Sequence, residues 1–140
     1  MILGIGTDIV NPTRFVRWQH YSAERVLRVF TLQELEVSTA SGKFVPEKLA
    51  VRFAAKEAFY KAFSAMLVGL GKTHKTASLL AVCKAVEVVA SDWGPQLLIN
   101  WEYLQELFGC ILPKVYVHCS LAHEREMVVA FVIIDGAYGS

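Results

Sequence analysis

The stretch 52–62, RFAAKEAFYKA, constrains this chain most, because it places charges in the middle of its most apolar segment. From residue 53 to residue 71 nearly every side chain is apolar or small, and the ionisable exceptions are Lys56, Glu57 and Lys61. In a helix, at roughly 100° per residue, Glu57 and Lys61 lie about 40° apart, with Ser64 just beyond them. The two charges therefore share one surface of an otherwise apolar helix.

Two interpretations of Glu57 and Lys61 are open. An i,i+4 pair with the glutamate on the N-terminal side is favourable and common on solvated helix faces, where it forms a surface salt bridge. A solvated face, however, usually carries polar residues along its whole length, and this segment has almost none on the neighbouring turns. An acid and a base that stay ionised against an apolar helix indicate a functional site.

The N-terminal residues 1–10 predict a β-strand that ends in a carboxylate. Apolar residues surround Gly4 and Gly6, which allow the backbone to approach another element closely. Asn11 and Pro12 then provide a helix N-cap and a proline at the first helical position. Asp8 is thus expected near the end of a strand and before a helix, as a presented ligand or as a turn or capping residue.

Taken together, these two segments resemble the signature motifs of a known family. Residues 52–62 resemble the signature helix of the phosphopantetheinyl transferases, specifically the short holo-[acyl-carrier-protein] synthases, and residues 4–10, GIGTDIV, resemble the family motif that ends in an aspartate. The motifs stand in the family's order and at about its spacing. The resemblance extends from the first expected strand to the last, and residues 72–81 depart from the usual pattern.

Asp8 and Glu57 suit a magnesium site. They are hard oxygen ligands without histidine or cysteine beside them, and Mg²⁺ keeps several waters and shares its coordination shell with a substrate phosphate. Lys61, one turn beyond Glu57, would lie beside that phosphate as a compact positive charge.

The resemblance implies the reaction and the catalytic residues Glu57, Lys61 and Asp8. In the family, the 4'-phosphopantetheine group moves from coenzyme A to a serine of apo acyl carrier protein, in fatty acid biosynthesis, and 3',5'-ADP is released. Positioning and charge neutralisation are sufficient for such a transfer, so no protein nucleophile is required. Glu57 could accept the serine proton directly or through a metal-bound water.

Further residues are assigned to coenzyme A binding by the resemblance. Arg52 and Lys43 match basic positions that help to hold the 3'-phosphate, although Arg52 could equally form a structural ion pair. Lys61 belongs to the same set. His123 ends the segment Ser-Leu-Ala-His, in which alanine replaces the second serine of the family's Ser-x-Ser-His. Pro95 directly follows Gly94, whereas the family has Gly-x-Pro, and it receives no role.

Four arginines form the basic block of the chain. Arg14, Arg17, Arg25 and Arg28 lie between residues 9 and 33 with Glu24 as the single acid. An acidic acyl carrier protein is the expected partner, because complementary charge accelerates encounter and fixes register. Nucleic acid is disfavoured, since the net charge is only +1 and no nucleic-acid motif accompanies the block.

Length and composition limit the remaining possibilities. The 140 residues correspond to a single domain, 1–140, and the apolar fraction of 54% favours an oligomer that shares apolar surface. The resemblance specifies a homotrimer with active sites between subunits, because longer transferases of the superfamily carry two such halves. No membrane span or signal peptide is expected, and three cysteines without CxxC spacing favour neither disulfides nor zinc. A cytoplasmic protein is predicted.

The expected fold is α+β, of the 4'-phosphopantetheinyl transferase type, with an antiparallel sheet packed on the long signature helix. After the first strand, the pattern predicts one or two helices over 13–29, and a capping box at Thr31 that opens a helix to about 39. A loop at 41–43 precedes the signature helix, which runs from Pro46 to about 68, and a loop over 71–79 follows it. The rest of the pattern predicts strands over 85–90, 96–100, 114–121 and 127–134, and a helix over 101–108.

Two other functions use similar residues. A noncatalytic coenzyme-A-binding or assembly subunit would keep the fold, but it would not need both Asp8 and Glu57. A magnesium-dependent nucleotide diphosphate hydrolase would need both carboxylates. Dependence on an acceptor protein distinguishes the hydrolase from the transferase.

Overall fold

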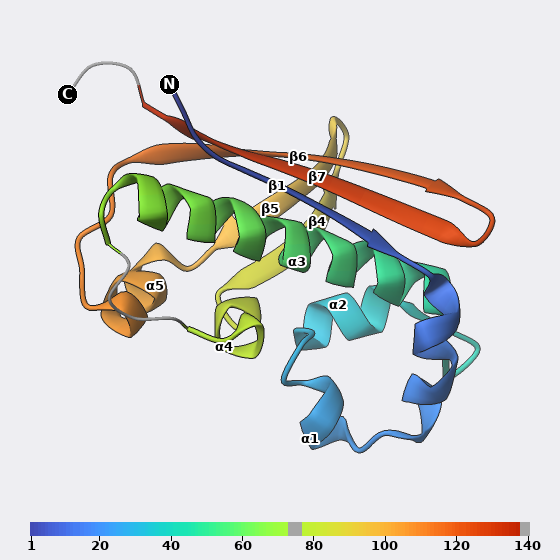
Figure 1. Ribbon diagram of the computed structural model, residues 1–140. Coiled ribbons are helices and arrows are strands. Elements are labelled where there is room, and N and C mark those ends of the chain that lie inside the picture. The colour runs from blue at the N-terminus through green and yellow to red at the C-terminus, as the bar shows by residue number, and fades with distance from the viewer. Residues whose placement is uncertain (73–76, 138–140) are drawn as a thin grey trace.

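The computed structural model describes residues 1–72 and 77–137 and has mixed α and β structure (Figure 1). The elements in chain order are β1 (Ile2–Val10), η1 (Pro12–His20), α1 (Ala23–Val26), α2 (Leu32–Val37), β2 (Thr39–Ala40), β3 (Lys43–Phe44), α3 (Pro46–Gly69), α4 (Leu79–Cys83), β4 (Val86–Ser91), β5 (Gly94–Ile99), α5 (Trp101–Phe108), β6 (Val115–Glu124) and β7 (Met127–Gly136).

A three-stranded antiparallel sheet of order β1-β7-β6 lies along α3, the long central helix (Figure 1). The first strand pairs with the last one, so that Asp8 lies opposite Ala130, and Ala130 lies opposite Leu121 on β6. Two-residue alternation places Asp8 and its opposite neighbours on the face toward α3. The predicted α+β fold, with an antiparallel sheet on the signature helix, is confirmed.

Two glycines let β1 approach α3 closely. A Cβ atom on Gly6 would lie 1.9 Å from the carbonyl oxygen of Ala58, and one on Gly4 would lie 2.0 Å from that of Ala62. Neither distance is compatible with a side chain, so the strand backbone rests directly on the helix backbone. Asp8, two residues beyond Gly6, is thereby brought to the middle of α3.

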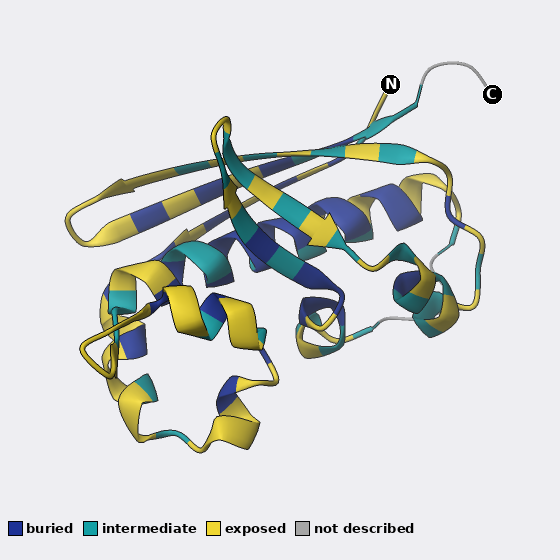
Figure 2. Ribbon diagram, turned by 180° about the vertical axis from the view of Figure 1, so that it is seen from behind, coloured by how far each residue is buried: buried dark blue, intermediate teal, exposed yellow. Residues whose placement is uncertain are grey.

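Burial follows the layers of the fold (Figure 2). The middle of α3 is buried on nearly all sides, against the sheet on one side and η1, α4 and β4 on others. Along β7 the residues alternate between buried and exposed, and the outward face of the sheet carries Ile5, Ile9, Val129 and Phe131, all exposed. No other part of the described chain covers that face (Figure 1).

Most of the expected elements are present, and the differences are local. The segment 13–29 forms two short helices, and the first, η1, is a 3-10 helix whose N-cap is Asn11, as predicted. Lys43 does not lie in a loop, because the hairpin β2–β3 turns at Ser41 and Gly42 and places Lys43 in β3.

The predicted loop 71–79 is also only partly correct. Its residues 73–76, with His74, lie outside the described residues, and its last residue, Leu79, begins α4, a helix that the prediction missed. A side chain of Ser78 caps α4 by accepting a hydrogen bond from the Ala81 amide. None of the helices in residues 1–72 and 77–137 has the length and apolarity needed to cross a membrane.

Candidate active site

Asp8 and Lys61 meet where β1 crosses α3. The Lys61 Nζ lies 3.0 Å from Asp8 Oδ1 and donates a second hydrogen bond, 2.9 Å long, to the carbonyl oxygen of Thr7. The Asp8 side chain is 9% exposed, whereas that of Lys61 is 48% exposed. The pair thus anchors the carboxylate below the surface and leaves part of the ammonium group accessible to a ligand.

This geometry decides between the interpretations that the sequence leaves open. Lys61 forms its ion pair with Asp8 and not with Glu57, so the local i,i+4 salt bridge is wrong. Asp8 is not a capping residue either, because the side chain of Asn11 accepts the hydrogen bond from the Thr13 amide at the start of η1. Both carboxylates are therefore free of the structural roles considered for them.

Glu57 lies beside Asp8 on the same side of α3. Partial burial raises the pKa of the Glu57 carboxyl above its ordinary value, and the neighbouring Asp8 carboxylate raises it further. Lys61 and Arg14 act in the opposite direction. Two neighbouring carboxylates with two cations nearby form a polar cluster at the edge of an apolar core.

This cluster fits a hard divalent cation. Asp8 Oδ2 is buried and has no hydrogen-bond partner among the described residues, so one ligand oxygen is uncommitted. A cation between Asp8 and Glu57 would also relieve the repulsion between the two carboxylates. Within the described ranges no group of three or more His, Cys, Asp or Glu side chains could hold a metal. Water and a substrate phosphate would have to complete the shell, as Mg²⁺ prefers.

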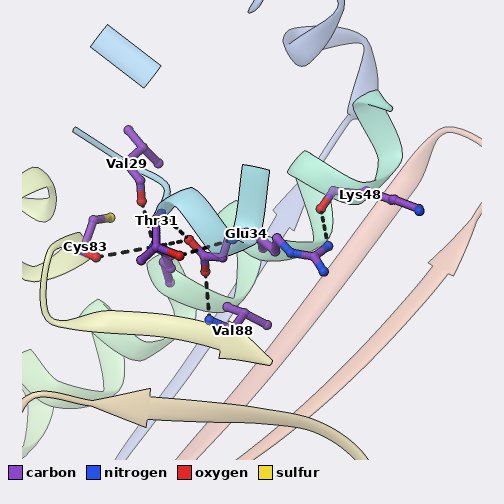
Figure 3. A network of polar contacts seen from close by, with 8 residues as sticks. Val29, Thr31, Glu34, Lys48, Cys83 and Val88 are labelled. Carbon is purple, nitrogen blue, oxygen red and sulfur yellow. Dashed lines mark hydrogen bonds and ion pairs between the residues drawn. The ribbon is translucent and has the colours of Figure 1, made fainter. Parts of the chain in front are cut away.

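Lys56, the third charge of the apolar helix, has a structural role that the sequence does not predict, in a buried polar network whose other members, Val29, Glu34 and Cys83, are labelled in Figure 3. Its Nζ, with a fully buried side chain, lies 2.7 Å from Glu34 Oε2, itself fully buried, and donates to the carbonyl oxygens of Val29 and Cys83. All three ammonium protons therefore have acceptors. The isolation of a lysine among apolar residues was the available signal, because a buried lysine requires a partner.

Glu34 completes the network from α2. Its carboxylate accepts hydrogen bonds from the Thr31 amide, which closes the predicted capping box, and from the Val88 amide of β4. The ion pair thus ties α2, β4 and the loop after α1 to the helix turn that carries Glu57. The carboxylate has three partners and the ammonium group has three, so the pair avoids the large cost of an unpaired buried charge.

Arg52 lies one turn before this network and is half-buried. Its Nη1 donates to the carbonyl oxygen of Lys48, and its Nε is buried without a partner among the described residues. Burial lowers the pKa of the guanidinium, against the attraction of Glu34. A cavity of about 270 Å³ beside Arg52 is lined by residues of the β4–β5 hairpin, including Pro95, and by Leu121 of β6.

The two remaining residues of the predicted coenzyme set are more peripheral. Lys43 is exposed on β3, and its side chain makes no hydrogen bond or ion pair with the residues that the structure describes. His123 is exposed near the end of β6, opposite Val128 on β7, which lies opposite Val10 on β1. His123 therefore lies at the same end of the sheet as Asp8, without a contact that would bring it into the Asp8, Glu57 and Lys61 cluster.

The predicted arginine block does gather on one surface. Arg14, Arg17, Arg25 and Arg28 line a cavity of about 850 Å³ together with Leu79 and Leu80 of α4. We call this cavity the arginine groove. Arg14 also lies close enough to Glu57 to lower its pKa, so the groove borders the carboxylate cluster.

The cysteine thiols take no part in these sites. Cys83, Cys110 and Cys119 are all free thiols, which agrees with the expectation of no disulfide framework. Burial raises the pKa of both the Cys83 and the Cys119 thiol to about 11. Both groups are therefore neutral at physiological pH and unreactive as nucleophiles.

Comparison with known proteins shows one family throughout. A model of the 4'-phosphopantetheinyl transferase superfamily matches residues 4–119. The holo-[acyl-carrier-protein] synthase of Treponema pallidum (strain Nichols) is 37% identical over 136 residues, which cover 97% of this chain and 98% of that protein. The enzyme of the same name from Treponema denticola is 34% identical, with coverage of 97% and 100%.

Solved structures agree with these relatives. The acyl carrier protein synthase of Mycobacterium tuberculosis is similar over 98% of this chain and 100% of its own, with 28% identity and a TM-score of 0.65. A holo-(acyl-carrier-protein) synthase of Bacillus anthracis, solved in complex with coenzyme A (3',5'-ADP), gives 27% identity and a TM-score of 0.65, with coverage of 98% and 99%.

Proposed function

The chain belongs to the holo-[acyl-carrier-protein] synthase family of the 4'-phosphopantetheinyl transferase superfamily, and from this we propose how its own residues act. It transfers the 4'-phosphopantetheine group from coenzyme A to a serine of apo acyl carrier protein, and it releases 3',5'-ADP. The observation that supports this most directly is the meeting of Asp8, Glu57 and Lys61, which come from two distant segments. We place the reaction in fatty acid biosynthesis and in the cytoplasm.

Asp8 and Glu57 are proposed as the magnesium ligands. When bound, the ion supplies positive charge to the diphosphate of coenzyme A, where negative charge develops on the leaving group. The uncommitted Oδ2 of Asp8 and the raised pKa of the Glu57 carboxyl both support a cation between the two groups. Lys61 holds Asp8 in place through Oδ1, which leaves Oδ2 as the available ligand atom.

Glu57 and Lys61 would carry out the remaining steps. Glu57 would accept the proton of the carrier serine, directly or through a water that it orients. The half-exposed ammonium of Lys61 would pair with a phosphate oxygen of coenzyme A. Catalysis then rests on positioning and on fixed charge, without a covalent enzyme intermediate.

Arg52, Lys43 and His123 are proposed as further contacts to coenzyme A. Arg52 has the best support, because its guanidinium keeps an uncommitted buried Nε beside a cavity of about 270 Å³. Lys43 and His123 are exposed and free to turn toward a ligand. Their proposed role requires that the coenzyme extend from Lys61 across the surface of the molecule.

A homotrimer with active sites between subunits is proposed as the working assembly. The outward face of the sheet exposes Ile5, Ile9, Val129 and Phe131 in adjacent positions of β1 and β7. A contiguous apolar face of this kind is unusual on a monomer and is typical of a subunit interface.

Analysis of the nucleotide products tests the transferase against the hydrolase. The protein is incubated with coenzyme A and Mg²⁺, with or without apo acyl carrier protein, and 3',5'-ADP is measured by liquid chromatography. The proposal predicts one 3',5'-ADP per carrier converted, and essentially none when the carrier is absent. Release of 3',5'-ADP at the same rate without a carrier would indicate hydrolysis instead.

A further inference from the structure

We propose that α4 supplies an apolar wall to the arginine groove, and that Leu80 on this wall selects the carrier protein by contact with apolar side chains on its acidic docking helix. The inference rests on the proposed transferase function, and it adds a specificity residue from an element outside the two signature motifs. Leu79 and Leu80 are the first two residues of α4, and both line the arginine groove.

The groove has two chemically different sides. One side carries the guanidinium groups of Arg14, Arg17, Arg25 and Arg28 from η1 and α1, and no acidic side chain lines it among the described residues. The other side carries Leu79 and Leu80 from α4. A groove with a cationic rim and an apolar wall complements an amphipathic helix whose polar face is acidic.

The cationic side is preorganised. The Arg14 guanidinium lies 5.1 Å from the ring centroid of Phe53, and that of Arg25 lies 3.8 Å from the ring centroid of Tyr21. Arg28 makes only a long, exposed ion pair with Glu24, at 3.8 Å. Stacking on aromatic rings holds a guanidinium in place while its N–H groups stay available for carboxylates. The guanidinium groups are therefore available to bind carboxylates of another protein.

The apolar side is anchored in the core, although Leu80 is incompletely covered. Val82 and Cys83 bury the far face of α4 in the core, and the Tyr60 hydroxyl donates to the carbonyl oxygen of Ala77 just before the helix. Leu80 nevertheless remains 43% exposed at the groove. A leucine held on a fixed helix beside a cavity gains free energy when an apolar side chain covers it, because apolar area is removed from water.

The position of the groove identifies the carrier as the occupant. Arg14 lines the groove and also influences the Glu57 carboxyl, and Phe53, another lining residue, lies one helical turn before Glu57. A helix docked between Arg14 and Leu80 would therefore hold its own polypeptide next to the carboxylate cluster. The acceptor serine must reach that cluster, whereas a protein that only binds the surface has no such requirement.

Steady-state kinetics of phosphopantetheine transfer test this inference on the full-length protein. We expect Leu80→Asn to raise KM for apo acyl carrier protein by about fivefold, because it removes an apolar contact at nearly constant volume. The kcat value and KM for coenzyme A should stay within about twofold of wild type, and Leu80→Met should retain the wild-type KM. The matched control is Leu32→Asn, a leucine 74% exposed in the first turn of α2 and outside the groove.

The dependence of KM on ionic strength distinguishes the apolar contact of Leu80 from the charge contacts of the arginines. Higher ionic strength should raise KM for the carrier in all variants, while the ratio between Leu80→Asn and wild type should stay constant, since apolar burial is not screened. An unchanged carrier KM in Leu80→Asn, an equal loss in Leu32→Asn, or an effect on KM for coenzyme A alone would overturn the inference. A wild-type protein that never modifies a carrier would instead refute the proposed function.

Discussion

At the scale of single residues, Glu57 has the most consequential surroundings. It lies on a mostly buried helix, next to Asp8 and within reach of Lys61 and Arg14, and its carboxyl pKa is raised mainly because burial disfavours the charged form. A charged glutamate in such a position lowers the free energy of unfolding, a cost that is typical of a functional site. The cost is partly offset by the two cations beside it.

The raised pKa predicts how Glu57→Gln changes stability. A carboxyl whose folded pKa exceeds its unfolded value contributes stability that is complete below the unfolded pKa and is lost as pH rises through the folded pKa. Without metal, Glu57→Gln should therefore be more stable than wild type at neutral pH, by less than about 1 kcal/mol because the group is partly solvent-screened. The advantage should disappear below about pH 4, where the carboxyl is protonated in both states.

Urea unfolding in EDTA at several pH values measures this difference. Mg²⁺ should then stabilise wild type at neutral pH and leave Glu57→Gln unaffected, since the variant lacks one ligand. A variant that is less stable than wild type at neutral pH, or an equal Mg²⁺ effect in both proteins, would show that Glu57 is not a strained metal ligand.

The sequence indicates which charged side chains are important better than it indicates which residues they contact. Asp8 and Glu57 stand out in the sequence because each lies in a short motif with a recognisable local pattern. The partners of Lys61 and Lys56 could not, because Asp8 is 53 positions from Lys61, and Val29, an acceptor for Lys56, is 27 positions from it. Helical spacing at i,i+4 suggested Glu57 for Lys61, and the close approach of β1 provided Asp8 instead.

At the scale of secondary structure, the contact of β1 with α3 determines the site. Gly4 and Gly6 put the strand backbone in direct contact with the helix backbone, and this contact brings Asp8 to Lys61. The glycines were predicted to allow a close approach, and the structure shows that α3 is the element approached. Any side chain at these positions would push the strand away from the helix.

Gly6→Ala should therefore lower both stability and activity. The added Cβ would lie 1.9 Å from a helix carbonyl oxygen, and relief of that overlap should cost about 3 kcal/mol or more. Displacement of Asp8 should reduce transfer by at least about 100-fold, because catalytic geometry is lost. Guanidinium unfolding and the transfer assay measure the two effects.

Gly69→Ala is the matched control for that change. Nothing lies within 4 Å of a Cβ atom at Gly69, which ends α3, so the substitution should leave stability unchanged or slightly raised. Equal tolerance of alanine at both positions would contradict the role assigned to Gly6.

Helices with strong end signals were the most predictable elements. Proline at the start and glycine at the end delimit α3 within a residue of the expected limits, and Asn100 with the left-handed Gly109 delimits α5. The five residues of α4 are too few to show a helical period, so its Ser78 cap was not recognised. The 3-10 character of η1 was likewise not visible in the apolar pattern.

At the scale of the whole molecule, the uncovered sheet face is the surface on which the proposed assembly would form. The apolar composition favours shared surface, and Ile5, Ile9, Val129 and Phe131 are the exposed apolar side chains on the side of β1 and β7 away from α3. Which residues gather on that face depends on the pairing of the first strand with the last, which composition cannot reveal.

Phe131→Lys should disrupt that assembly. Light scattering should give about three times the chain mass of 15.6 kDa for wild type and a smaller species for the variant, because a lysine in an apolar interface is costly to desolvate. Transfer activity should fall at least about tenfold if the sites lie between subunits. Leu32→Lys, on a different exposed surface, should change neither value. A fully active wild-type monomer would refute the proposed trimer.

Intact mass of an apo acyl carrier protein tests the central claim most directly. The carrier is incubated with coenzyme A, Mg²⁺ and the wild-type protein, with Glu57→Gln, Asp8→Asn and EDTA samples in parallel. The account predicts that wild type adds one phosphopantetheine to the carrier, and that each variant and the chelator slow this addition by at least about 100-fold. An unmodified carrier with wild type, or modification at the wild-type rate by Glu57→Gln, would contradict it.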